Sequence, residues 1–204
     1  MALHEAFTNN YFPGFTEAVP GYASLAVFYD LTAVLKYHPE EATAFDFVKA
    51  YTETLIAQLS PAVRARDRQI ISVPVFYNGN DLGYISNLHH ISVDTIIDLH
   101  TQPVYRVYMI GFLPGFAYMG TVDERIATPR KTTPRIQIPA GSIGIAGFQT
   151  GIYPFSSPGG WQLIGQTPLK IFDKDKTNPC LFNAGDKIKF MAINEDEFDH
   201  LNEY

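Results

Sequence analysis

Glycine and proline are concentrated in one part of this chain, between Met109 and Pro168. That segment holds ten of the 15 glycines and seven of the 14 prolines. No helical period is visible in it. Short pieces typical of strands alternate with Gly/Pro turns from here onward, at 136–139, 142–146, 161–164, 169–172 and 187–193. Many short strands at close spacing predict a closed or nearly closed β-barrel, which we place over residues 69–204.

Residues 1–68 have a different pattern, which predicts a small α+β domain. The apolar run 24–29 is rich in strand formers. Pro39, followed by two glutamates, is typical of a helix start. A stripe at three- and four-residue steps then predicts a helix with a buried face, ended by Ser60-Pro61. The members of this stripe are Phe45, Val48, Thr52, Leu55, Ile56 and Leu59.

The start of the barrel region contains two further strand patterns and one helix pattern. Residues 69–77 and 104–112 read as strands, and Asn78-Gly79-Asn80 reads as a turn. Ser92 is a suitable N-cap for a short helix over 93–99. The fold class is therefore mostly β, with an α+β lobe at the N-terminus.

Composition and charge exclude several classes of protein. The chain has 204 residues, of which 46% are hydrophobic and 18% charged, so a globular core is expected. The formal net charge of −6 argues against general nucleic-acid binding. No apolar run approaches the ~20 residues that span a bilayer, and the start lacks a signal-peptide pattern. A single cysteine fits a reducing compartment, so we expect a cytoplasmic protein.

The segment from Arg125 to Phe172 contains no aspartate or glutamate. Five cations fall inside it, and arginine is suited to forked recognition of carboxylates and phosphates. Charge alone leaves two interpretations open, a solvated basic face or a site for an anionic ligand. The segment offers no carboxylate for acid–base chemistry, so a base would come from His100, from Asp123 or Glu124, or from another chain. These sequence features predict half of a site. The cations are Arg125, Arg130, Lys131, Arg135 and Lys170.

Other sequence features give weaker evidence of function. The run from Gly160 to Thr167 has the glycine spacing of a phosphate-binding loop, but Gln166 replaces its lysine. Cys180 has no basic cluster nearby and is expected to pack passively. His89 and His90 are adjacent and point apart, so no metal site is expected there. Without a phosphate-binding loop, this chain is expected to bind no cofactor. His100 ends a predicted helix, where it either caps the helix or transfers protons.

Several long motifs make the chain resemble a known family. These motifs are GFLPGFAYMG at 111–120, DERIATPR at 123–130, IPAGS at 138–142, GFQTGIYP at 147–154, SPGGW at 157–161 and GQTP at 165–168. The sequence is similar to the B subunit of prokaryotic 5-oxoprolinase, also called the KipI family or allophanate hydrolase subunit 1, a carboxyltransferase domain of type C/D. The resemblance implies a cyclophilin-like β-barrel and a complex with the A subunit and the C subunit of the same enzyme, the latter itself a related barrel.

The resemblance also implies a function and a pocket. Such complexes use ATP to cleave 5-oxo-L-proline to L-glutamate, and we expect this chain to be inactive alone. Opening the lactam of this small anionic amide develops an oxyanion, which arginine and amide donors stabilise. The expected catalytic residues are His100, Tyr118 and Gln149. The expected substrate-binding residues are Arg130, Arg135, Ser157, Gly159, Gly160 and Trp161, and Pro114 and Gly115 would help to shape the pocket.

The N-terminus departs from the family pattern, and other functions stay open. Family members usually begin with an extra strand, whereas this chain is expected to start within the following helix, near Ala2 to Asn10. The small sheet would then have an open edge or altered pairing. Alternative functions are an inhibitor of a sensor histidine kinase, a component of an allophanate hydrolase or urea carboxylase, and a prolyl isomerase.

Overall fold

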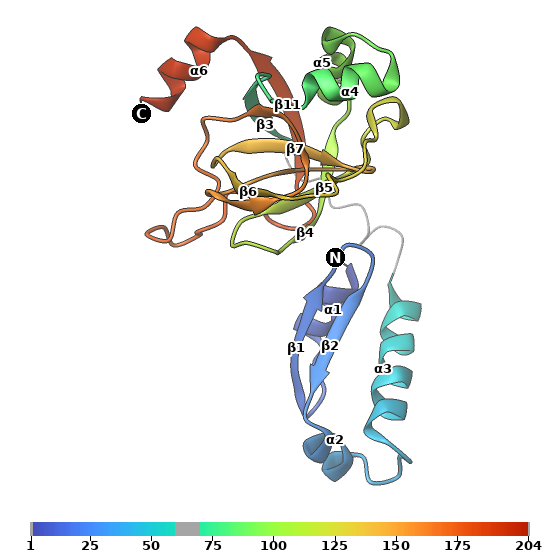
Figure 1. The fold of residues 1–204 in the computed structure, drawn as a ribbon. Helices are drawn as coiled ribbons and strands as arrows, with labels where there is room; N and C mark the ends of the chain where they lie inside the picture. Colours follow the sequence, from blue (N-terminus) through green and yellow to red (C-terminus); the bar gives the residue numbers. More distant parts are fainter. Residues whose placement is uncertain (1, 60–69, 204) are drawn as a thin grey trace. The chain divides into compact units, whose positions relative to one another are not determined.

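The computed structural model describes residues 2–59 and 70–203. The chain divides into two compact units, Met1–Asp67 and Arg68–Tyr204, called here the N-terminal unit and the barrel unit (Figure 1). No helix in the described part is long and apolar enough to cross a membrane.

The N-terminal unit packs three helices against a two-stranded sheet. Strands β1 (Phe15–Pro20) and β2 (Leu25–Tyr29) are antiparallel, and within residues 2–59 they pair only with each other. A helix was expected near Ala2 to Asn10, and α1 occupies Ala2–Asn9. The other two helices are α2 (Leu31–Tyr37) and α3 (Ala44–Gln58). Phe7, Phe12 and Val34 are central to the aromatic core of this unit.

The prediction that a helix starts at Pro39 is wrong. Helix α3 begins at Ala44, because the Thr43 side chain accepts from the Asp46 backbone N–H and caps it. The apolar stripe is buried only in part: Val48 and Leu55 lie in the core, whereas Phe45 is 63% and Ile56 47% exposed. The predicted stop at Ser60-Pro61 lies outside the described residues.

The barrel unit contains seven strands that close on themselves, in the order β10-β3-β11-β4-β5-β8-β7. Every neighbouring pair is antiparallel except β3 and β11, which are parallel. The prediction of a mostly β protein with a C-terminal barrel is therefore confirmed. The strands are β3 (Ile70–Phe76), β4 (Tyr105–Ile110), β5 (Ala117–Gly120), β7 (Ser142–Ala146), β8 (Gln149–Ile152), β10 (Gln162–Gln166) and β11 (Lys187–Ile193).

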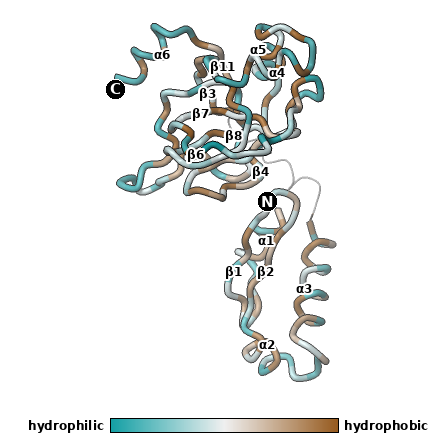
Figure 2. Tube along the Cα trace, in the orientation of Figure 1, coloured by the Kyte–Doolittle hydropathy of each residue, from teal (hydrophilic) through white to brown (hydrophobic). Residues whose placement is uncertain are grey.

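A second, two-stranded ribbon and several helices complete this unit. The ribbon pairs β6 (Arg135–Ile138) with β9 (Ser157–Gly159). Helix α6 has no buried residue and is mostly hydrophilic in Figure 2, whereas the barrel interior is lined by aliphatic and aromatic side chains. The helices are α4 (Leu82–His89), α5 (Val93–Thr101), the short 3-10 helix η2 (Glu124–Ile126) and α6 (Glu195–Asn202).

Predictions in the barrel unit are correct for elements whose formation depends on residues close in sequence. The strands expected at 142–146 and 187–193 match β7 and β11, and the Ser92 side chain caps α5. The strand expected at 169–172 is wrong. Only Phe172 makes an isolated bridge, to Cys180, because this segment hydrogen-bonds to a loop that contains Pro179. The first residue of the strand predicted at 69–77, Gln69, lies outside the described residues.

Candidate functional site

The outer face of strands β5, β8 and β7 has a floor made largely of glycine. Tyr118 is opposite Gly151, and Gly151 is opposite Gly144. Side chains alternate along a strand, so the buried Thr150 points into the barrel, whereas Tyr118, Gly144 and Gly151 lie on the outer face. A Cβ added to Gly144 would lie 2.9 Å from Cβ of Trp161. The two glycines therefore allow aromatic rings to lie directly on the strands.

Four aromatic side chains gather on this floor. The ring of Phe116 lies 4.7 Å from Tyr118, 5.1 Å from Tyr153 and 5.4 Å from Trp161, measured between centroids. Ile138 of the β6–β9 ribbon belongs to the same cluster. Edge-to-face contacts of this kind hold each ring in one orientation. The result is a stiff aromatic cluster on the outside of the barrel, in which Phe116, Tyr153 and Trp161 are buried and Tyr118 is half-buried; its outer edge is called here the aromatic surface.

Arg130 lies over this surface. Its guanidinium carbon is 5.9 Å from the Trp161 ring centroid, a cation–π distance. Burial raises the pKa of Tyr118, an effect that the Arg130 charge opposes. Burial likewise raises the pKa of Tyr153 to about 12. Both phenols are therefore neutral at pH 7, and Tyr118, which is only half-buried, can donate a hydrogen bond to a ligand.

The cations of the acid-free segment differ in their partners. Arg125 pairs with Asp123 at 2.8 Å and Lys170 with Asp173 at 3.0 Å. Lys131 and Arg135 both pair with Asp81. Within residues 2–59 and 70–203, Arg130 is the member of this group that makes no ion pair. Three carboxylates from outside the segment thus neutralise four of its five cations. The fifth, Arg130, is exposed and available to bind an anion.

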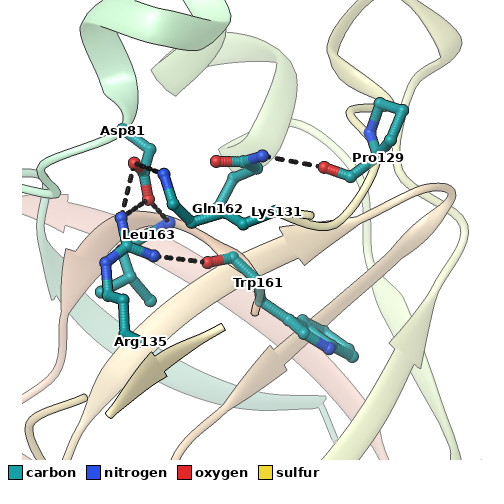
Figure 3. Close-up of polar contacts among 7 residues, drawn as sticks. All are labelled: Asp81, Pro129, Lys131, Arg135, Trp161, Gln162 and Leu163. Atoms are coloured by element: carbon teal, nitrogen blue, oxygen red, sulfur yellow. Dashed lines mark hydrogen bonds and ion pairs between the residues drawn. The ribbon is translucent and has the colours of Figure 1, made fainter. Parts of the chain in front are cut away.

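Asp81 forms a buried ion-pair cluster with two of these cations (Figure 3). Its carboxylate is 4% exposed and does not cap α4, the helix that it precedes. Arg135 Nη2 donates to both oxygens at 2.6 and 2.5 Å, and Lys131 Nζ lies 3.4 Å away. The backbone N–H of Leu163 donates to it at 2.6 Å. A buried carboxylate surrounded by donors in this way is a structural charge rather than a free base.

Further hydrogen bonds fasten the segment 129–135 to strand β10 and the two residues before it. Arg135 Nη1 donates to the Trp161 carbonyl at 3.1 Å, and the Lys131 N–H donates to Gly160 at 2.7 Å. Gln162 Nε2 donates to the Pro129 carbonyl at 2.8 Å. Figure 3 shows the Trp161 ring extending away from Asp81. Arg135, predicted to hold substrate, is thus occupied by Asp81 and Trp161.

His100 lies inside the barrel and not on the outer face. It is fully buried and stacks on Phe190 at 4.6 Å. Thr150 donates to the Gly144 carbonyl at 3.1 Å, so its hydroxyl accepts from His100 Nε2, 2.9 Å away. His100 Nδ1 then accepts from the Tyr77 hydroxyl at 2.7 Å. Burial lowers the pKa of His100 to about 3, which keeps the ring neutral despite its place at a helix C-terminus.

The remaining predicted residues lie around the aromatic surface. Gln149 is on the same strand face as Gly151 and diagonal to Tyr118, within reach of a shared ligand. The Ser157 hydroxyl is buried and has no hydrogen-bond partner in the described part of the chain. Gly159 leaves room for the Tyr153 hydroxyl, which a side chain there would meet. Gly115, in the turn before β5, has a positive φ, and a side chain there would meet Phe172.

The structure therefore brings some predicted residues together and separates others. Tyr118, Arg130 and Trp161 converge, with Gln149 beside them. His100 is separate from them. Sequence reasoning missed Asp81, which is 54 residues before Arg135 and carries no local signal of its role. Among the described residues, no group of three His, Cys, Asp or Glu side chains could hold a metal ion.

Comparison with known proteins places the chain among carboxyltransferase-type domains. The 5-oxoprolinase B subunit of Bacillus subtilis is 45% identical over 196 residues, covering 94% of this chain and 81% of that protein. The Escherichia coli O157:H7 protein of the same name is 37% identical over 186 residues, covering 90% and 80%. Urea amidolyase of Saccharomyces cerevisiae is 29% identical over 136 residues, which are 61% of this chain and 7% of that protein.

Solved structures agree with these relatives. The crystal structure of PH0987 from Pyrococcus horikoshii is 41% identical with a TM-score of 0.62, covering 96% of this chain and 87% of that one. TTHA0988 is 33% identical with a TM-score of 0.77, and this chain spans about a third of its length, 36%, while 95% of this chain is covered. A family model described as the carboxyltransferase domain, subdomain C and D, matches residues 1–182. The resemblance seen in the motifs is confirmed, and the chain belongs to this carboxyltransferase-domain family.

Proposed function

We propose that this chain is one subunit of an ATP-dependent complex that opens the lactam of 5-oxo-L-proline to give L-glutamate. Two relatives that align with most of the chain carry the name of the 5-oxoprolinase B subunit. That name implies partners, which we identify with the A and C subunits of the same enzyme. We assign ATP to the partners, because the sequence of this chain contains no phosphate-binding loop.

The observation that carries the proposal is the exposed Arg130, which lies above Trp161 and beside Tyr118 and pairs with no carboxylate of the described residues. 5-Oxoproline combines a carboxylate with a compact amide ring. Arg130 would bind the carboxylate by paired N–H donors, and the lactam ring would lie against Tyr118, the half-buried ring of the aromatic cluster. An anion at this position would gain a charge-assisted bond without displacing an internal carboxylate.

The same surface offers donors for the reacting amide. As the lactam carbonyl is attacked, negative charge develops on its oxygen. The neutral Tyr118 hydroxyl and the Gln149 amide lie diagonally on the strand face and would donate to that oxygen. The Ser157 hydroxyl, without a partner in the described residues, would orient the ring. These groups position substrate and stabilise charge, and none of them is a strong base.

Proton transfer is assigned to a partner subunit rather than to His100. Both nitrogens of His100 are engaged inside the barrel, and its pKa of about 3 leaves it unprotonated at neutral pH. Asp81 is saturated by donors. Arg135 is assigned to holding Trp161 and not to holding substrate. This division of labour explains why we expect the chain alone to be inactive.

Reconstitution tests the proposal. The chain would be co-expressed with candidate A and C subunits, and glutamate release from 5-oxoproline would be followed with and without ATP. Arg130→Gln should lower kcat/KM about 100-fold, the typical cost of losing one donor that meets developing or fixed negative charge. Lys174→Gln removes an exposed cation from the 173–178 region and is the matched control. Full activity of Arg130→Gln in an intact complex would refute the site.

A second candidate is cleavage or carboxylation of urea-type amides, favoured by the likeness to yeast urea amidolyase. Urea has no carboxylate for Arg130 to bind, whereas allophanate, which is urea carboxylated on nitrogen, has one, so Arg130 speaks against urea and not against allophanate. The same reconstituted complex would be assayed with urea and with allophanate. Activity on these substrates with none on 5-oxoproline would favour the second candidate. The expected alternative of a histidine-kinase inhibitor gains no support from these relatives.

A further inference from the structure

The carboxylate of Asp81 is the point at which three separate segments of the barrel unit meet. Asp81 itself immediately precedes helix α4. Its carboxylate contacts Lys131 and Arg135, at and before the start of β6, and Leu163 in strand β10. We propose that Asp81 is a positioning residue that holds Arg130 above the Trp161 ring, acting through Arg135 and Lys131. The inference rests on the proposed function only for its effect on turnover.

Asp81 is itself fixed in place by strand β10. Its backbone N–H donates to the Leu163 carbonyl at 3.0 Å, and its side chain accepts from the Leu163 N–H at 2.6 Å. Gly79, two residues earlier, donates to the Ile164 carbonyl at 3.2 Å. The carboxylate therefore sits at a position set by backbone pairing. A charge that is buried and fixed in this way can orient flexible cations around it.

The first connection runs through Arg135 to the aromatic surface. The guanidinium binds Asp81 through Nη2 and the Trp161 carbonyl through Nη1, at 3.1 Å. The planar fork of arginine makes both contacts at once, so fixing one end fixes the other. Asp81 thus sets the backbone of the residue whose ring lies beneath Arg130.

The second connection runs through the residues that flank Arg130. On one side Pro129 accepts from Gln162, and on the other Lys131 donates its N–H to Gly160 and its ammonium lies 3.4 Å from Asp81. The Arg130 side chain has no ion-pair partner of its own in the described residues. Its place above Trp161 is therefore determined by its flanks, and one of those flanks is held by Asp81.

Asp81 also determines which arginine meets a ligand. Arg130 lies over the Trp161 ring and Arg135 donates to the Trp161 carbonyl, so both cations lie beside the same residue. With Asp81 present, Arg135 is neutralised by an ion pair. Without it, Arg135 and Lys131 would carry uncompensated charge and compete with Arg130 for an anion. The carboxylate therefore acts on geometry and on charge together.

Fluorescence of Trp161 tests this without substrate, because Trp161 is the single tryptophan of the chain. The indole is 4% exposed, so its emission maximum depends on the groups packed around it and little on solvent. The Arg130 charge lies over the ring, and Arg130→Gln should therefore shift the emission maximum by about a few nanometres. Asp81→Asn should shift it in the same direction by a similar amount, while circular dichroism shows an intact fold.

Two further variants separate positioning from general loss of stability. Asp186→Asn removes another buried carboxylate, in the turn before β11, and should leave the Trp161 emission maximum at the wild-type value. If Asp81→Asn alone does not fold, Asp81→Asn with Arg135→Gln removes the pair together and should still shift the emission maximum. A folded Asp81 variant, single or double, with the wild-type emission maximum would overturn the inference.

Activity then distinguishes this inference from the proposed function. In the reconstituted complex, Asp81→Asn should raise KM for 5-oxoproline more than it lowers kcat, because the arginine that binds the carboxylate is misplaced. If the Trp161 emission maximum shifts in both Arg130→Gln and Asp81→Asn while glutamate release is unchanged, the proposed function fails and the positioning role stands. If only Arg130→Gln shifts the emission maximum, the positioning role fails and the proposed function stands.

Discussion

Polar side chains lie against both faces of strands β7 and β8, but only those on the inner face are paired with one another. On the inner face, Thr150 joins His100 to the Gly144 carbonyl in a buried chain of hydrogen bonds that begins at Tyr77. On the outer face, Arg130 lies exposed over Trp161 with no ion pair within the described residues. Polar groups that satisfy one another stabilise the fold, whereas a preorganised group without a partner is available to a ligand.

Replacing His100 should give the largest effect and tests whether the inner face is structural. His100→Ala leaves a cavity beside Phe190 and strips partners from Tyr77 and Thr150. We expect the free energy of unfolding to fall by about 3–5 kcal/mol, as for other large-to-small changes in packed cores. Urea denaturation of the purified chain would measure it. In contrast, a catalytic His100 would lose turnover with little change in stability.

Adding one methyl group to the outer floor should have the next largest effect. Gly144→Ala places a Cβ 2.9 Å from Cβ of Trp161, so the indole has to move. We expect a loss of about 1–3 kcal/mol and a shifted Trp161 emission maximum. The control is Gly83→Ala in α4, where nothing lies within 4 Å of the added carbon. That change should stabilise the chain by about 0.5–1 kcal/mol, and unchanged Trp161 emission in Gly144→Ala would contradict the contact.

The elements that sequence reasoning recovered are those with strong local signals. Ser92 is a side-chain cap, and β7 (SIGIA) and β11 (KIKFMAI) each contain isoleucines or other strand formers between turn residues. The strands β5 and β8 were missed, because each has only four residues and one of the four is a glycine. Their strand character comes from closing the barrel between β4 and β7, which is a long-range property.

The site shows the same limit. Tyr118, Arg130 and Trp161 could be named from the motif resemblance, and the structure places them together. Asp81 could not, because its partners come from segments far along the chain. His100 sits in the last turn of α5, where the helix dipole favours a charged ring, yet burial in the barrel outweighs that preference.

The pH dependence of stability should also distinguish the two faces. The folded pKa of His100 is about 3, below its ordinary value of 6.5, so the unfolded chain binds more protons between these values. The stability contributed by neutral His100 is therefore complete above pH 6.5 and is lost as the pH falls towards 3. The slope is up to about 1.4 kcal/mol per pH unit. Urea denaturation at pH 6.5 and 5.0 should show this slope, and His100→Gln should reduce it.

Removing one hydroxyl from the outer face should give the smallest effect and should change ligand chemistry alone. Tyr118→Phe keeps the ring that packs on Phe116 and Trp161, so stability should change by less than about 1 kcal/mol. Because burial keeps the phenol neutral, the lost group is a hydrogen-bond donor and not a charge. We expect kcat/KM of the reconstituted complex for 5-oxoproline to fall about 3- to 10-fold, the worth of one neutral hydrogen bond. Tyr84→Phe on α4, which is exposed, is the matched control and should leave turnover unchanged. Equal losses of kcat/KM in Tyr118→Phe and Tyr84→Phe would mean that the Tyr118 hydroxyl does not bind substrate. The inner and outer faces would then differ in burial alone.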